Sequence, residues 1–159
     1  FAVVGAVVGE YLGAAAGRIL KPCEGYDDMS DKRRVLLVDD DVDFLEANRV
    51  ALEARGFEVL TASDSRHGVE VAAKEHPDLI IMDLMMERLY AGFSAVQALA
   101  ANEETAEIPV IMVSAVTTET GFRVDDREQR PEWLRVVEFI NKPIDPLALA
   151  DKASALVGA

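Results

Sequence analysis

Polar side chains with metal-binding or nucleophilic chemistry stand within two residues of the ends of four apolar runs of this sequence, VLLV, LIIM, VIMV and FI. They are the carboxylates of Asp39, Asp40 and Asp83, the hydroxyl of Ser114 and the ammonium of Lys142. The apolar runs VLLV, LIIM and VIMV have the length and β-branched composition of buried strands. A buried strand that delivers like charges to one point indicates that something at that point binds them.

Three carboxylates held close together repel one another and raise one another's pKa values. A hard divalent cation removes the repulsion, and Mg²⁺ takes oxygen ligands in an octahedron while it keeps several waters. Two or three carboxylates and one backbone carbonyl from a following loop suit this ion. The sequence therefore favours a Mg²⁺ site, provided that the fold brings the strand ends together.

The apolar periodicities predict an α/β fold. Strands are predicted at RVLLVD, FEVLTA, DLIIMD, IPVIMVSA and VEFI, and helices at VDFLEANRVALEAR, SRHGVEVAAKEH, GFSAVQALAAN and DPLALADKASALV. The segment 115–136 is predicted to be polar and then helical around PEWLRV. Alternation of this kind predicts a doubly wound, five-stranded parallel sheet with helices on both faces. A flavodoxin-like strand order, 2-1-3-4-5, places the four polar strand ends side by side, where ligands of such sheets bind.

Composition excludes some classes of function. The chain has 159 residues, enough for one domain with a core, and a formal net charge of −13. This charge repels a phosphate backbone, so nucleic-acid binding is not expected. Cys23 is the single cysteine, which leaves no disulfide framework and no cysteine metal site. We interpret His67 and His76 as surface histidines, because neither has a second ligand at metal spacing.

Residues 1–31 differ in composition from the rest and are predicted to be an appendage with a linker. The segment FAVVGAVVGEYLGAAAGRIL places glycines at 5, 9, 13 and 17, the small-residue spacing of closely packed membrane helices. Glu10 lies at its centre and is costly in lipid, so we favour a helical or disordered segment over a membrane anchor. Residues 32–159 are predicted to be the functional domain, and no membrane association is expected for them.

Four motifs in register, VLLVDDD, LIIMDLMM, VIMVSA and FINKP, resemble the receiver domain of two-component response regulators over residues 33–158. The resemblance implies that Asp83 accepts a phosphoryl group from a histidine kinase, with Mg²⁺ as the cofactor. It also implies the protein ligands of the ion. They are Asp40 and Asp83 directly, Asp39 through water, and the backbone carbonyl of Met85.

The resemblance further implies a switch at the remaining strand ends. Ser114 binds one phosphoryl oxygen and Lys142 another. Phe139, at the position of the family's switch aromatic, moves inward when Ser114 moves and reshapes a binding face. The bond between Lys142 and Pro143 matches a peptide that is cis in the family.

A regulator rather than an enzyme is implied, because its chemistry is limited to self-phosphorylation and self-dephosphorylation. The implied partners are a sensor histidine kinase or phosphotransfer protein and an unknown protein target. The target face comprises the helix expected within 115–136, the strand 137–140 and the helix 145–157. We expect a cytoplasmic single-domain receiver without an output domain, which acts by protein contact.

The loop after the acceptor, LMMERLYAGF, departs from the pattern of related receivers. Glu87 takes the position of a common proline, and Gly92 comes one residue late. Met85 and Val116 flank the expected path of a hydrolytic water. Because both are apolar, we predict slow self-dephosphorylation.

Two alternative functions use the same residues. A pseudo-receiver would fold in the same way and serve as an interaction module without being phosphorylated. A Mg²⁺-dependent phosphatase with an aspartate nucleophile would need Thr or Val at Asp43, so the sequence argues against it. A calcium loop beginning at Asp39 fails, because Phe44 stands where glycine is required.

Overall fold

The computed structural model of the chain describes residues 32–88, 91–115 and 136–158. The predictions for residues 1–31, for Val116 and for the helix around PEWLRV fall outside the described residues. The unit that contains the described residues begins at Lys32.

Five parallel strands form one sheet in the order β2-β1-β3-β4-β5, which confirms the flavodoxin-like prediction. The strands are β1 (Arg34–Val38), β2 (Glu58–Ala62), β3 (Leu79–Asp83), β4 (Val110–Ser114) and β5 (Val136–Asn141). The described helices are α2 (Val42–Ala54), α3 (Ser65–Glu75), α4 (Ala91–Ala101) and α6 (Pro146–Val157). Strand β5 is two residues longer than VEFI, because its end pairs with the end of β4 through Asn141 and Ser114.

Short polar signals in the sequence set the helix boundaries. The side chain of Asp41 accepts the first free N–H groups of α2, and the side chain of Asp145 does the same for α6, which starts with Pro146. Gly56 follows α2 with φ +93°, a conformation that glycine adopts without strain. Each of the two capping aspartates directly follows a strand end or its loop, so both helices begin near the same edge of the sheet.

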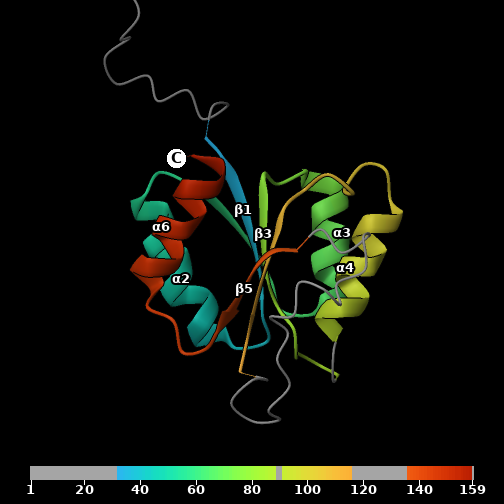
Figure 1. Cartoon of the computed structure of the whole chain (residues 1–159), viewed down its shortest axis with the longest axis horizontal. Helices are drawn as coiled ribbons and strands as arrows, with labels where there is room; N and C mark the ends of the chain where they lie inside the picture. The colour runs from blue at the N-terminus through green and yellow to red at the C-terminus, as the bar shows by residue number, and fades with distance from the viewer. Residues whose placement is uncertain (1–31, 89–90, 116–135, 159) are drawn as a thin grey trace, which may run out of the picture. The chain divides into compact units, whose positions relative to one another are not determined.

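Alternate residues of the central strands fill two separate cores. Helices α2 and α6 cover one face of the sheet, and α3 and α4 cover the other (Figure 1). Leu36 of β1 and Ile80 of β3 point to the α3 and α4 face, whereas Leu37 and Ile81 point to the α2 and α6 face. Strands β3 and β4 are buried along their whole length. A sheet buried on both faces holds its strand ends in a fixed register.

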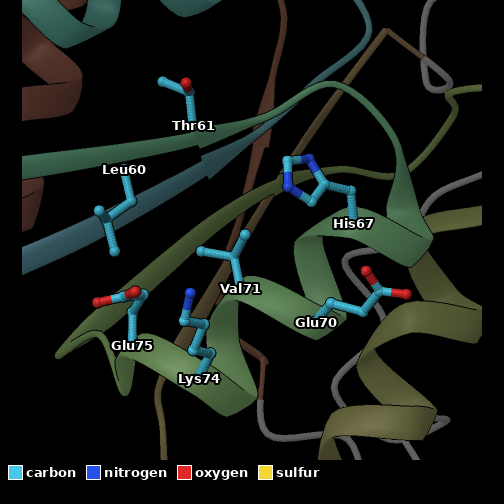
Figure 2. A pocket seen from close by; sticks show the side chains of 7 residues that line it. All are labelled: Leu60, Thr61, His67, Glu70, Val71, Lys74 and Glu75. Carbon is cyan, nitrogen blue, oxygen red and sulfur yellow. The ribbon is translucent and has the colours of Figure 1, made fainter.

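A shallow hollow of about 410 Å³ lies between the edge strand β2 and helix α3 (Figure 2). Leu60 and Val71 supply its apolar lining, and His67, Glu70 and Lys74 surround them with charges of both signs. The hollow lies away from the carboxyl ends of the central strands, and none of the predicted phosphoacceptor, metal-binding or switch residues lines it.

None of the helices within 32–88, 91–115 and 136–158 has the length and hydropathy needed to cross a bilayer.

Replacement of Leu36 by alanine tests the account of the core. Leu36 is 0 % exposed, so Leu36→Ala should lower the free energy of unfolding by about 2–5 kcal/mol in urea titrations. Val50 is 57 % exposed on α2, and Val50→Ala should change it by less than about 0.5 kcal/mol. Equal losses in the two variants would contradict the assigned core.

Candidate phosphoacceptor and metal site

The carboxyl ends of β1 and β3 place two aspartates next to each other. Val38 pairs with Met82 across the two strands, so Asp39 and Asp83 follow at the same level of the sheet. Asp39 is 1 % exposed and Asp83 is 7 % exposed. Two carboxylates in a buried position require a compensating charge.

Lys142 supplies one such charge from the end of β5. Its Nζ lies 2.6 Å from Oδ2 of Asp39 and 3.4 Å from Oδ2 of Asp83. The ring of Phe44 lies beneath the ammonium, with 4.2 Å between Nζ and the ring centroid. The peptide bond between Lys142 and Pro143 is cis. The strand order therefore brings a lysine from late in the chain onto carboxylates that end β1 and β3.

Asp40 completes a cluster of three carboxylates. One oxygen each of Asp39, Asp40 and Asp83 can be chosen so that all lie within 4.8 Å of one another. Asp40 is exposed, which leaves this side of the cluster open to solvent. Within the described residues, the Lys142 ammonium alone does not balance three carboxylates. An oxygen-rich, half-open cluster of this kind fits a hydrated divalent cation such as Mg²⁺. The residues that would hold the ion are Asp39, Asp40, Asp83 and the Met85 carbonyl.

Burial is the largest influence on the pKa values of the ionisable groups in the site. It raises the pKa of Asp83 to about 6, and the neighbouring charge of Asp39 adds to the rise, while Lys142 opposes it. Burial also raises the pKa of Asp39, against the hydrogen bond from Lys142. Burial alone would lower the pKa of the lysine, but its bonds to both carboxylates raise it. Repulsion between carboxylates was the cause expected from the sequence, and the repulsion from Asp39 is the second-largest cause of the raised pKa of Asp83.

The loop after Asp83 is held close to that residue. The N–H of Met85 donates to Oδ1 of Asp83 at 3.2 Å, and the N–H of Gly92 donates to the carbonyl of Leu84 at 2.9 Å. A Cβ at Gly92 would lie 2.3 Å from the carbonyl oxygen of Asp83, so only glycine fits there. Although Gly92 comes one residue later than in related receivers, it still lets α4 approach the acceptor strand.

Ser114 and Phe139 lie on the neighbouring strands. Ser114 ends β4, is buried, and accepts the N–H of Lys142 at its backbone carbonyl. Phe139 pairs with Met112 within the sheet and packs partly buried against the core beneath α3 and α4. The structure thus brings all the predicted site residues to the carboxyl edge of the sheet or to the strands that end there, and their roles remain predictions.

Comparison with known proteins identifies the class. The family model "Response regulator receiver domain" matches residues 35–154, and the chain belongs to this family of two-component signalling domains. The chain is similar to the protein PilH of Pseudomonas aeruginosa, with 33 % identity over 124 residues that cover 78 % of this chain and 97 % of PilH. It spans about half the length of several other curated relatives.

Solved structures share the fold. A response regulator from Desulfuromonas acetoxidans is 29 % identical and superposes with a TM-score of 0.64, which covers 78 % of this chain and 95 % of that one. The chain is also similar to the receiver domain of the sensor histidine kinase PA1611 from Pseudomonas aeruginosa PAO1, with 21 % identity and a TM-score of 0.65. The superposition covers 80 % of this chain and 99 % of that domain. That protein has a magnesium ion coordinated in its active-site cleft, and at this identity the likeness to our chain shows the fold alone.

Sequence reasoning missed two contacts around the site. The ring of Phe44, an apolar position of the predicted helix 42–55, lies under Lys142. Glu87 was noted as a departure from the family pattern, yet its carboxylate bonds to Ser65. Neither contact has a local sequence signal, because each joins side chains from elements that meet only in the folded chain.

The raised pKa of Asp83 predicts a pH-dependent effect of its removal. Because the folded-state pKa of about 6 exceeds the unfolded value of about 3.9, ionised Asp83 lowers stability at pH 8, and this cost disappears below about pH 4. In metal-free buffer, Asp83→Asn should therefore raise the free energy of unfolding by about 2 kcal/mol at pH 8 and leave it nearly unchanged at pH 4. Urea titrations at both pH values measure this difference.

Glu103→Gln is the matched control, because it removes an exposed carboxylate far from the site and should show no such difference between the two pH values. If Asp83→Asn destabilised the protein at pH 8, the assigned burial of an uncompensated charge would be wrong.

Proposed function

We propose that this receiver domain is a phosphoacceptor in a two-component phosphorelay and that Asp83 receives the phosphoryl group. One observation carries the proposal: the buried Asp83 carboxylate lies 3.4 Å from the Lys142 ammonium and within 4.8 Å of the carboxylates of Asp39 and Asp40. The first contact suits charge neutralisation on a phosphoryl oxygen, and the second suits a bound cation. These are the two requirements of phosphoryl transfer, which depends on positioning and charge stabilisation.

In the proposed step, an Oδ of Asp83 attacks the phosphorus of a phosphohistidine on a kinase or phosphotransfer protein. The new P–O bond forms as the P–N bond breaks, and the imidazole nitrogen leaves with the electron pair of that bond and takes up a proton. Bound Mg²⁺ would supply positive charge to the phosphoryl oxygens. Lys142 would turn from Asp39 toward the phosphoryl group, while Asp39 and Asp40 would hold the ion with the Met85 carbonyl.

The consequence that we propose is a change of shape on one face. A phosphoryl group adds negative charge and acceptor oxygens at Asp83. Ser114 would be drawn toward it, and Phe139, which packs partly buried on the neighbouring strand, would move inward. The proposed target is a protein that binds the face formed by β5 and α6. Because the phosphodonor is a kinase that uses ATP, we place this function in the cytoplasm.

Intact-mass measurement after incubation with acetyl phosphate and Mg²⁺ tests the acceptor. The wild-type protein should gain the mass of one phosphoryl group, and Asp83→Asn should gain none. Lys142→Ala should slow the gain by about tenfold or more, because a charge that stabilises the transferring group is lost. Glu103→Gln should behave as wild type.

An unmodified wild-type protein would favour the pseudo-receiver. Turnover of small phosphoesters would favour the phosphatase with an aspartate nucleophile.

The lifetime of the phosphorylated form tests the predicted slow hydrolysis. Met85 follows the acceptor by two residues and is apolar, so it offers no hydrogen bond to an attacking water. After removal of the phosphodonor, the added mass should decay over minutes or longer. A decay within seconds would contradict this prediction.

A further inference from the structure

One side chain ties the loop between β3 and α4 to helix α3. Glu87 lies four residues after Asp83, and its carboxylate accepts hydrogen bonds from the hydroxyl and from the backbone N–H of Ser65, the latter at 3.3 Å. Ser65 is 7 % exposed and is the first residue of α3. An exposed glutamate is therefore held by a buried, well-fixed partner.

The contact satisfies a donor that α3 itself leaves free. The first N–H groups of a helix have no acceptor within the helix, and negative charge is favoured near them. The side chain of Asp64 accepts the N–H of His67 at 2.8 Å, which satisfies one of these donors. Glu87 accepts the N–H of Ser65 from outside the helix, so it adds an acceptor that the local cap does not supply.

The contact with Ser65 lies two residues from Met85, whose backbone N–H contacts the acceptor carboxylate. Met85 stands midway between Asp83 and Glu87. On one side, its N–H donates to the acceptor carboxylate and the N–H of Gly92 holds the carbonyl of Leu84. On the other side, Glu87 is bound to α3. The Met85 carbonyl is thus fixed from both directions along the chain.

We propose that Glu87 is a positioning residue for the metal site: through Ser65, it holds the loop so that the Met85 carbonyl can bind Mg²⁺ together with the aspartates. This inference rests on the proposed function. The hydrogen-bonded contact between the loop and α3 limits the freedom of the loop.

Calorimetric titration of the full chain with Mg²⁺ tests the proposal. Glu87→Ala removes both hydrogen bonds and should weaken Mg²⁺ binding by about tenfold, the low end of the range for groups that orient metal ligands. Ser65→Ala removes the hydroxyl bond alone and should weaken binding less. Because Ser65→Ala removes part of the contact that Glu87→Ala removes entirely, the double variant should bind Mg²⁺ no more weakly than Glu87→Ala. In metal-free protein, the backbone amides of Met85 and Ser65 should exchange hydrogen faster in both single variants.

Two further variants separate the contact from the charge. Glu87→Gln keeps an acceptor oxygen and loses the charge, so it should bind Mg²⁺ more tightly than Glu87→Ala. Glu70→Gln removes an exposed carboxylate from α3, the helix that begins with Ser65, on the side that lines the hollow of Figure 2. Its affinity for Mg²⁺ should stay within about twofold of the wild-type affinity. If Glu87→Gln bound Mg²⁺ as weakly as Glu87→Ala, loss of charge alone would be responsible and the proposal would be overturned.

The readouts also separate this proposal from the proposed function. If the wild-type protein bound Mg²⁺ but gained no phosphoryl group, the proposed acceptor function would be wrong. The Mg²⁺ titrations would still test whether Glu87 positions the metal site. If it were phosphorylated while Glu87→Ala bound Mg²⁺ like wild type, the Glu87 proposal alone would fail. Absence of Mg²⁺ binding in the wild type would overturn both. Should Glu87→Ala lose its thermal unfolding transition, Ser65→Ala and Glu87→Gln decide the question.

Discussion

The candidate site of this receiver domain depends on the burial of carboxylates at the ends of two central strands. Asp39 and Asp83 lie side by side with almost no exposure, and burial raises the pKa of each. Such an arrangement lowers stability unless positive charge is brought to it. Lys142 brings one charge and leaves the cluster of three carboxylates short of balance. The remaining demand for a cation is what makes the site suited to Mg²⁺.

The fold maintains this unfavourable arrangement through the two cores on either side of the sheet. Residues of β1, β3 and β4 alternate between the α2 and α6 core and the α3 and α4 core, and nearly all of them are fully buried. A slip of one residue in any of these strands would exchange the two cores, so the register is strongly specified. The same register fixes the positions of the strand ends, and therefore those of Asp39, Asp83 and Ser114. Stability gained in the cores offsets the cost of the site.

Much of this could be predicted from the sequence, because the strands are continuous apolar runs and the helices carry capping residues. The runs before Asp39 and Asp83 predicted two adjacent strand ends, and the strand order is the predicted one. Strand β5 was predicted less well because it is an edge strand with partly exposed residues, so its apolar signal is weaker. The place of Phe44 under Lys142 and the bond between Glu87 and Ser65 could not be predicted. Both depend on side-chain directions that are set only when separate elements pack together.

A crystal structure with Mg²⁺ and beryllium trifluoride, a stable mimic of a phosphoryl group, tests the central claim most directly. The account predicts beryllium bonded to an Oδ of Asp83 and Mg²⁺ held by the three aspartates directly or through water. It also predicts that the Lys142 ammonium has turned from Asp39 to a fluorine. Crystals soaked with both reagents in which Asp83 carries no beryllium and Lys142 is still bound to Asp39 would contradict the account.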